Sequence, residues 1–252
     1  MDIISINCDS QYFNYNNNNN EYTYKLQNEI KNVTSMRLSS IELPNSFYTF
    51  SKKRGNTIFN IEINSEKYEI LIIDGNYDSY LLISNIQKLF DEINSNHGYD
   101  FKINLNAING KSSITNNNNF KLNFINTNKY DKGLGSILGY DKLEYNDKNE
   151  YISEYILNTY IDQYILMSIN HEKIIETYTH DNYNYSFAKI ILNSDKYTII
   201  NDNGSNLLTK KKIYKNLINI SHIIIKLYDS QLECIEMNNI TFSFTLEFTK
   251  KY

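Results

Sequence analysis

The feature of this chain that most constrains its fold is an alternation of apolar and polar residues that returns in segment after segment. Side chains of a β-strand point to opposite faces in turn, so this alternation predicts strands with one buried face. Clear examples are Thr57–Ile63, Lys67–Ile73 and Ile240–Phe248. The last of these places on one face Phe242, Phe244, Leu246 and Phe248. About ten short segments of this kind, separated by turn residues, predict an all-β fold.

The period changes clearly in one place. Apolar residues there recur with the spacing of one face of an α-helix, at Leu82, Ile86, Leu89 and Ile93. Asp78 or Ser79 is expected to cap the start of this helix. Gly98 is expected to end it, because glycine readily adopts a positive φ. We therefore predict one amphipathic helix at about residues 78–96, inserted between strands, with its apolar stripe facing the core.

Short strands with a single helix among them are typical of a jelly-roll β-sandwich rather than of a parallel α/β sheet. The sequence shows no internal repeat and no linker. The simplest division is an N-terminal strand and polar arm over residues 1–20, followed by one jelly-roll-type β domain over residues 21–252. An asparagine-rich arm of this kind is expected to become ordered when a partner binds it.

Some segments are harder to assign. Tyr22–Leu26 and Val33–Leu43 are predicted as separate strands, and Pro44, the only proline, ends the second because it cannot donate to a strand ladder. The segment Tyr155–Ile169 is long enough for one long strand or two short ones. The basic run Lys210–Lys215 is interpreted as a solvated turn, with a short helix as the alternative.

Charge and hydropathy exclude two classes of partner. The formal net charge of −4 argues against a nucleic-acid-binding domain, which usually carries a basic patch. No apolar run approaches the ~20 residues that cross a bilayer, and no secretory signal opens the chain. The 23 tyrosines and 12 phenylalanines suit both a pleated sheet and a protein interface. We therefore expect protein partners, no nucleic acid and no membrane span.

The sequence offers no catalytic or metal-binding pattern. The four histidines lack ligand spacing, and only His171 and His180 are close in sequence, whereas a cupin-like metal enzyme needs two or three convergent histidines. The glycines of the segment 133–139 miss the dinucleotide fingerprint, so this segment is interpreted as a loop that packs its apolar residues onto a sheet end. Cys8 and Cys234 are expected to be reduced, with a single bridge between them as the alternative. We expect neither an enzyme nor a cofactor.

The order of several short motifs resembles that of jelly-roll minor capsid and penton-like virion proteins of large nucleocytoplasmic DNA viruses, the giant viruses. In the N-terminal part these motifs are Ile6-Asn7, Tyr22–Leu26, Val33–Leu38 and Ile41–Tyr48. They continue with Gly75-Asn76-Tyr77, the helix Leu81–Ile93, Leu138-Gly139-Tyr140 and Thr241–Glu247. The resemblance covers almost the whole chain. One segment departs from the pattern, because Tyr228–Leu232 lacks a glycine after the aspartate.

The resemblance implies a structural virion protein, either a penton at a capsid vertex or a minor capsid subunit, made in the host cytoplasm and located in the virion. Its partners would be the major capsid protein, minor capsid proteins and further copies of itself, up to a pentamer. Candidate interface residues, chosen for aromatic content and expected exposure, are Tyr12, Phe13, Tyr15, Phe47, Tyr48, Tyr140, Tyr145 and Tyr151. The alternative is a β-sandwich binding module of a virion fibre that recognises a glycan or a receptor, although the chain has no tryptophan.

Overall fold

The structure is a computed structural model that describes residues 2–8, 14–16, 21–124, 133–178, 183–203, 208–209 and 211–251. It divides the chain into two compact units: unit 1 is Met1–Phe47 with Asp162–Tyr252, and unit 2 is Tyr48–Ile161. This differs from the expected arm and single β domain. No change of composition marks residues 47 and 162, and the first strand belongs to the sheet of unit 1.

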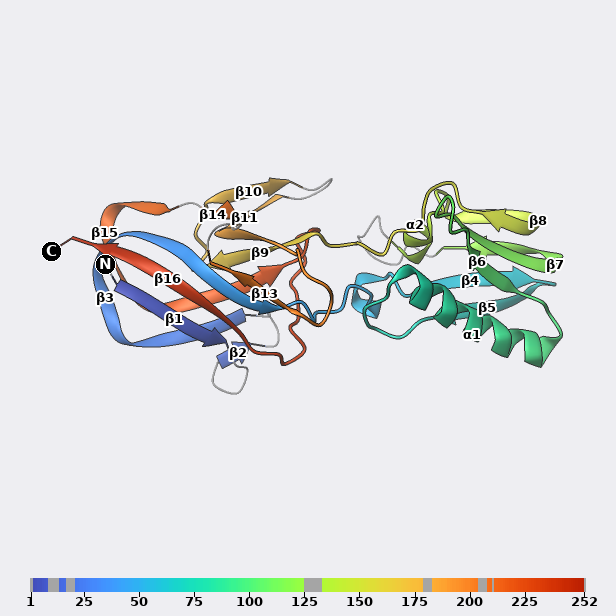
Figure 1. The fold of residues 1–252 in the computed structure, drawn as a ribbon, viewed down its shortest axis with the longest axis horizontal. Coiled ribbons are helices and arrows are strands. Elements are labelled where there is room, and N and C mark those ends of the chain that lie inside the picture. The colour runs from blue at the N-terminus through green and yellow to red at the C-terminus, as the bar shows by residue number, and fades with distance from the viewer. Residues whose placement is uncertain are drawn as a thin grey trace. The chain divides into compact units, whose positions relative to one another are not determined.

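Unit 1 is built on one large antiparallel sheet (Figure 1). The strands of this unit are β1 (Asp2–Cys8), β2 (Asn14–Asn16), β3 (Glu21–Pro44), β9 (Tyr164–Ile169), β10 (Ile175–Tyr178), β11 (Tyr183–Ser186), β12 (Ala188–Ile191), β13 (Ile199–Asp202), β14 (Leu208–Thr209), β15 (Lys212–Tyr228) and β16 (Phe242–Lys250). The order is β1-β16-β3-β15-β9-β12-β14, and β2 and β13 also pair with β3. β10 and β11 form a separate two-stranded sheet.

The 24-residue strand β3 joins the two segments that the sequence predicted as separate strands. Its polar middle continues the ladder because backbone pairing does not need apolar side chains. The strand is irregular there: Asn32 has a φ of 56° and its N–H donates to Asn219 Oδ1 at 3.1 Å. The pairing of β3 with β15 shifts register nearby, as at β-bulges, and bulges bend a strand and strengthen its twist.

The curled sheet encloses its own core. Ile6 of β1 and Ile190 of β12 come from strands near opposite ends of the sheet order, yet both belong to one buried cluster. The predicted inward face of the last strand is confirmed, because its four apolar residues, Phe242 to Phe248, are all buried. Burial of one face of each strand is what closes a β-sandwich without a second chain.

Unit 2 combines a smaller sheet with a helix. Its elements are a 3-10 turn η1 (Lys52–Arg54), β4 (Ile58–Ile63), β5 (Glu66–Leu71), α1 (Ser79–His97), β6 (Lys102–Leu105), β7 (Ser112–Asn123), α2 (Leu134–Leu138) and β8 (Glu144–Ile152). The order is β5-β4-β7-β6, and β8 also pairs with β7. α1 lies against one face of this sheet (Figure 1). The prediction of an all-β, jelly-roll-type fold with one inserted amphipathic helix is thus confirmed.

The helix α1 starts and ends as its sequence predicts. Asp78 Oδ1 accepts from the N–H of Leu81 at 2.7 Å, and Gly98 adopts a φ of 72° after the last turn. The buried face consists of Leu82, Ile86 and Phe90, and the rings of Phe59 and Phe101 lie 6.4 and 5.7 Å from that of Phe90. The packing of these rings holds α1 against the sheet.

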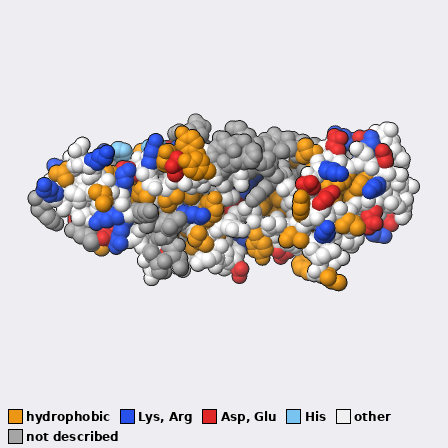
Figure 2. All heavy atoms as spheres, turned by 90° about the horizontal axis from the view of Figure 1, so that it is seen from above, with side chains coloured by type: hydrophobic (Ala, Val, Ile, Leu, Met, Phe, Trp, Pro, Cys, Tyr) orange, Lys and Arg blue, Asp and Glu red, His pale blue; other side chains and the backbone are white. Residues whose placement is uncertain are grey.

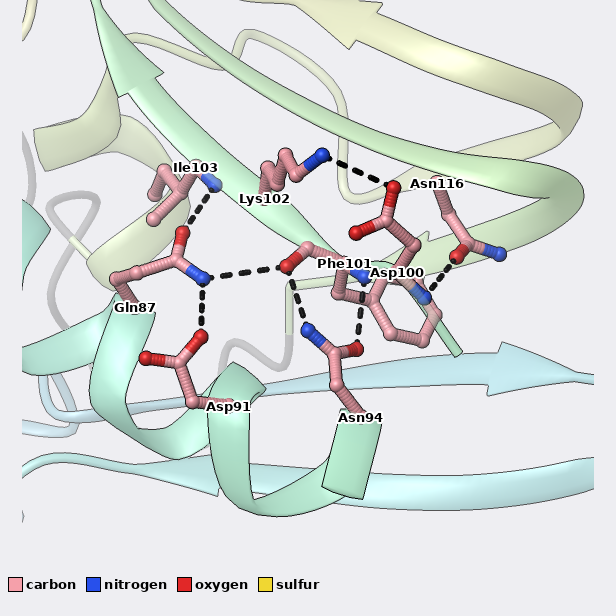
Figure 3. Close-up of polar contacts among 8 residues, drawn as sticks. All are labelled: Gln87, Asp91, Asn94, Asp100, Phe101, Lys102, Ile103 and Asn116. Carbon is pink, nitrogen blue, oxygen red and sulfur yellow. Dashed lines mark hydrogen bonds and ion pairs between the residues drawn. The ribbon is translucent and has the colours of Figure 1, made fainter. Parts of the chain in front are cut away.

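Two amide side chains of α1 also cover an edge of the sheet (Figure 3). Asn94 donates to the carbonyl of Phe101 at 2.9 Å and accepts from its N–H at 2.7 Å. Gln87 Oε1 accepts from the N–H of Ile103 at 2.9 Å. β6 pairs with β7 on its other side, so these amides satisfy backbone groups that an edge strand would leave open to another chain.

Three segments differ from their sequence assignments. The expected loop around Leu134–Leu138 is the short helix α2, which packs so closely that a Cβ on Gly135 would lie 2.3 Å from Cγ of Phe124. The segment Tyr155–Ile169 contains a single strand, β9. Of the basic run Lys210–Lys215, residues 212–215 lie in β15 and Lys210 lies outside the described residues; exposed lysines are compatible with the solvent face of a strand.

We expect the two units to unfold as separate steps, because each has its own hydrophobic core. Phe90→Ala should lower the free energy of unfolding of unit 2 by about 3–5 kcal/mol and leave unit 1 unchanged. The control Tyr80→Ala, on the exposed side of α1, should change it by less than about 0.5 kcal/mol. Scanning calorimetry tests this expectation, and one transition that shifts as a whole would contradict it.

Candidate assembly surface

In the part of the chain that the structure describes, no group of three or more His, Cys, Asp or Glu side chains is placed to hold a metal ion. No helix among these residues has the length and hydropathy to span a bilayer. Cys8 and Cys234 are both thiols and are not joined by a disulfide, as expected. Burial raises the pKa of the Cys8 thiol well above its ordinary value.

The predicted interface residues of the N-terminal part have different positions. Tyr12 and Phe13 lie outside the described residues, and Tyr15 lies in β2, which pairs with β3. Phe47 is buried, and the ammonium of Lys196 lies 4.0 Å from its ring centroid. Phe47 is therefore a core residue rather than a contact residue, whereas Tyr48 is exposed.

Tyr140 and Tyr151 are also buried, which corrects their assignment to a surface. The hydroxyl of Tyr140 donates to the carbonyl of Tyr151 at 3.1 Å, and the hydroxyl of Tyr151 donates to the carbonyl of Phe120 at 2.7 Å. The ring of Tyr140 stacks on Phe124 at 4.9 Å. A buried tyrosine is stable when its hydroxyl finds an acceptor, and both hydroxyls find backbone carbonyls here.

Tyr145 is partly exposed and stands at the centre of a polar cluster. Its hydroxyl donates to Glu154 Oε2 at 2.6 Å and accepts from the N–H groups of Asp141 and Lys142 at 3.1 Å. Burial, followed by the hydrogen bond to Glu154, raises the pKa of Tyr145 to about 12. Burial alone would raise the pKa of Glu154, but hydrogen bonds from Tyr145 and from the N–H of Asp141 outweigh it and lower that pKa.

An open groove of about 380 Å³ lies beside this cluster, over β8. Lysines and glutamates line it together with Tyr145 and Tyr151: Lys142, Lys148, Glu144, Glu150 and Glu154. Small-molecule sites are usually lined mainly by apolar side chains. A lining of mixed charge instead suits hydrogen bonds and ion pairs with a complementary protein surface, which specify a partner.

Two of the motifs on which the resemblance to virion proteins rests, at Gly75 and Gly139, connect chain segments of unit 2 by backbone hydrogen bonds. Gly139 has a φ of 94°, and a Cβ there would lie 2.3 Å from the carbonyl oxygen of Tyr155, so glycine is required. The N–H of Tyr155 donates to the carbonyl of Gly139 at 2.8 Å. Gly75 and Phe50 exchange two backbone hydrogen bonds of 2.9 and 3.0 Å, and the ring of Tyr77 packs edge-on against that of Phe50.

In unit 1, the motif at the end of β3 forms hydrogen bonds with a turn that is far away in sequence. Asn45 is buried, its Nδ2 donates to the carbonyl of Ser194 at 2.8 Å, and its N–H donates to the carbonyl of Thr198 at 2.8 Å. Tyr228–Leu232, the segment that lacks the glycine expected from the resemblance, is also fixed by hydrogen bonds. Asp229 Oδ1 accepts from the N–H groups of Gln231 and Glu233, and Leu232 adopts the positive φ of 70°. These motifs therefore serve the fold.

Exposed apolar side chains that the sequence reasoning missed lie around the segment 152–160. Leu157 N–H donates to the carbonyl of Gly110 at 2.8 Å, and Ile156 would contact a Cβ on Gly110 at 3.4 Å, so this segment adjoins the turn that carries Ile108. Ile108 is 98% exposed and Tyr160 is 81% exposed. We define the apolar strip as Ile108, Tyr155, Ile156 and Tyr160. Figure 2 shows further hydrophobic side chains among charged ones on both units.

We expect Tyr145→Phe to destabilise the protein by about 1 kcal/mol at neutral pH, because the partners of the hydroxyl are left unpaired. The raised pKa of Tyr145 gives a stabilisation that is present below pH of about 10 and lost as pH rises to about 12. The variant should therefore lose less stability over this alkaline range than the parent. Urea unfolding at several pH values measures this, with Tyr48→Phe as the exposed control. An unchanged alkaline slope would contradict the assigned hydrogen bond.

No protein-family model and no curated protein matches this chain. Solved structures that are similar to it include the following two. One is the crystal structure of selenomethionine-labelled mavirus penton protein, with 12% identity, a TM-score of 0.49, and coverage of 98% of this chain and 99% of that chain. The other is the 3.5 Å cryo-electron microscopy structure of the Sputnik virophage, with 12% identity, a TM-score of 0.44, and coverage of 100% of both chains. Both alignments extend over unit 1 and unit 2.

Proposed function

We propose that this chain is a structural virion protein that acts through protein–protein contacts and carries out no catalysis. It is a penton at a capsid vertex or a minor capsid subunit, made in the host cytoplasm and located in the virion. Its partners are the major capsid protein, minor capsid proteins and further copies of itself. The order of the sequence motifs supports this proposal, together with the structural use of the motifs at Asn45, Gly75 and Gly139.

The observation that carries the proposal is the apolar strip. Its four large side chains are exposed and come from two adjoining segments of unit 2. Large exposed apolar patches on soluble proteins commonly mark surfaces that meet another protein. Tyrosine is also enriched in such interfaces because it buries a large area and keeps a polar tip. The strip is therefore the surface that we assign to subunit contacts.

The mixed-charge groove over β8 complements the strip. An apolar patch supplies most of the binding energy of an interface, whereas charged groups at its rim fix orientation and exclude wrong partners. In a closed ring each subunit uses one surface against a different surface of its neighbour. Lys148 and Glu150 in the groove can pair with opposite charges of a neighbouring subunit in such a contact.

We expect the purified protein to form a closed oligomer, and Ile156→Asp to convert it to a monomer because a charge would be buried in the contact. Light scattering measures both native masses. Ile73→Asp is the matched control, since Ile73 is 77% exposed and lies outside the strip. Circular dichroism should show that both variants fold. Oligomers that survive Ile156→Asp would contradict the assignment of the strip, and a monomeric parent would favour the minor capsid role over the penton.

The virion location has its own test. Mass spectrometry of purified virus particles should detect this chain in a fixed ratio to the major capsid protein, because subunits of a closed shell have a defined copy number. Particles that lack the chain, from cells that contain it, would contradict a structural role in the virion.

A further inference from the structure

The hairpin of β10 and β11 presents tyrosines on one side only. In its register Glu176 lies opposite Tyr185, and Tyr178 lies opposite Tyr183. Residues two apart on a strand, and residues directly opposite on neighbouring strands, share a face. Glu176, Tyr178, Tyr183 and Tyr185 therefore form one face, which we name the tyrosine face. The opposite face of these two strands is the more buried one, and Ser186 on that face is buried.

The tyrosine face is open to solvent. Tyr178 is 72% exposed and Tyr183 is 63% exposed. The ring centroids of these two residues lie 6.1 Å apart with planes 32° apart, and the ring of Tyr185 stands edge-on to Tyr183 at 6.0 Å. Figure 2 shows hydrophobic side chains gathered over β10 and β11, with an acidic side chain beside them. The rings make a small aromatic platform.

Charged side chains lie beside the rings. The interaction with the carboxylate of Glu176 raises the pKa of Tyr178 and of Tyr185. The ammonium of Lys173 lies 4.6 Å from the centroid of the Tyr185 ring. Groups held before a ligand arrives lose less conformational entropy on binding, so this arrangement is prepared for a ligand.

The size and charge of the platform limit its occupant. Two strands of four residues span about 14 by 10 Å, whereas a stable protein interface buries about 800 Å² on each partner. Nucleic acid also stacks on aromatic rings, but Lys173 beside the carboxylate of Glu176 does not give the positively charged groove that phosphates need. A neutral sugar fits better: the C–H face of a pyranose is apolar, and its hydroxyls donate to carboxylates.

We propose that the tyrosine face binds a neutral oligosaccharide. Pyranose rings stack on Tyr178 and Tyr183, and their hydroxyls donate to Glu176. β-Linked sugars of gluco configuration suit it best, since their equatorial hydroxyls leave both ring faces free for stacking. This activity is additional to the capsid role, and gives a structural subunit a contact to glycans at a surface that the particle meets.

Saturation-transfer difference NMR on the whole protein tests the proposal, with millimolar cellotetraose as the probe and maltotetraose as the α-linked comparator. We expect cellotetraose ring protons to receive saturation from the protein, and to receive more than those of maltotetraose. Tyr178→Ala and Tyr183→Ala should each weaken binding about two- to tenfold, the range for loss of one aromatic contact. Tyr80→Ala, which removes a tyrosine of unit 2 that is 71% exposed and lies outside the apolar strip, should leave the signal unchanged.

Three results would overturn the proposal. The first is no transfer to cellotetraose, and the second is transfer that persists in the Tyr178→Ala and Tyr183→Ala variants. The third is a fall of the native mass in either variant, measured by light scattering, because the tyrosine face would then be a contact between protein subunits. Glu176→Gln keeps the shape of the face, so a loss of binding in this variant without a change in mass would support the proposal.

Discussion

Backbone hydrogen bonding along β3 is the constraint on which the rest of unit 1 depends. On one edge this strand pairs with β2 and β16, and on the other with β15 and β13. A β-strand leaves a row of N–H and C=O groups on each edge, and here those of a 24-residue strand are shared among four partners. The bend near Asn32 turns one ladder into a curled sheet that encloses a single core.

Periodicity predicted the local fold well, and long-range organisation less well. The face of Phe242 to Phe248 and the limits of α1 were read from the sequence because burial of one face imposes a period on the residues. The joining of two segments into β3 was missed, since a ladder can cross a polar stretch. The insertion of unit 2 was missed for a related reason: alternation describes each strand but not its partners.

Aromatic content alone could not separate core from surface. Tyr140 and Tyr151 were expected at an interface, but their hydroxyls donate to backbone carbonyls inside unit 2. The tyrosine face, by contrast, could have been found: Glu176 and Tyr178 alternate with Ile175 and Thr177, and Tyr183 and Tyr185 alternate with Asn184 and Ser186. The sequence pattern does not predict the register, that is, which residues of β10 and β11 lie opposite one another. That register depends on the geometry of the hairpin.

Unit 2 is continuous in sequence, whereas unit 1 is assembled from the segments before and after it. During synthesis the ribosome therefore finishes unit 2 long before β15, the longest partner of β3, emerges. For that time the edge of β3 that later pairs with β15 is unpaired, and unpaired edges in other chains invite aggregation. Its middle carries exposed Lys25, Glu29 and Lys31, and charges of this kind act as gatekeepers against such pairing. The polar stretch that bends the finished sheet thus also protects the nascent chain.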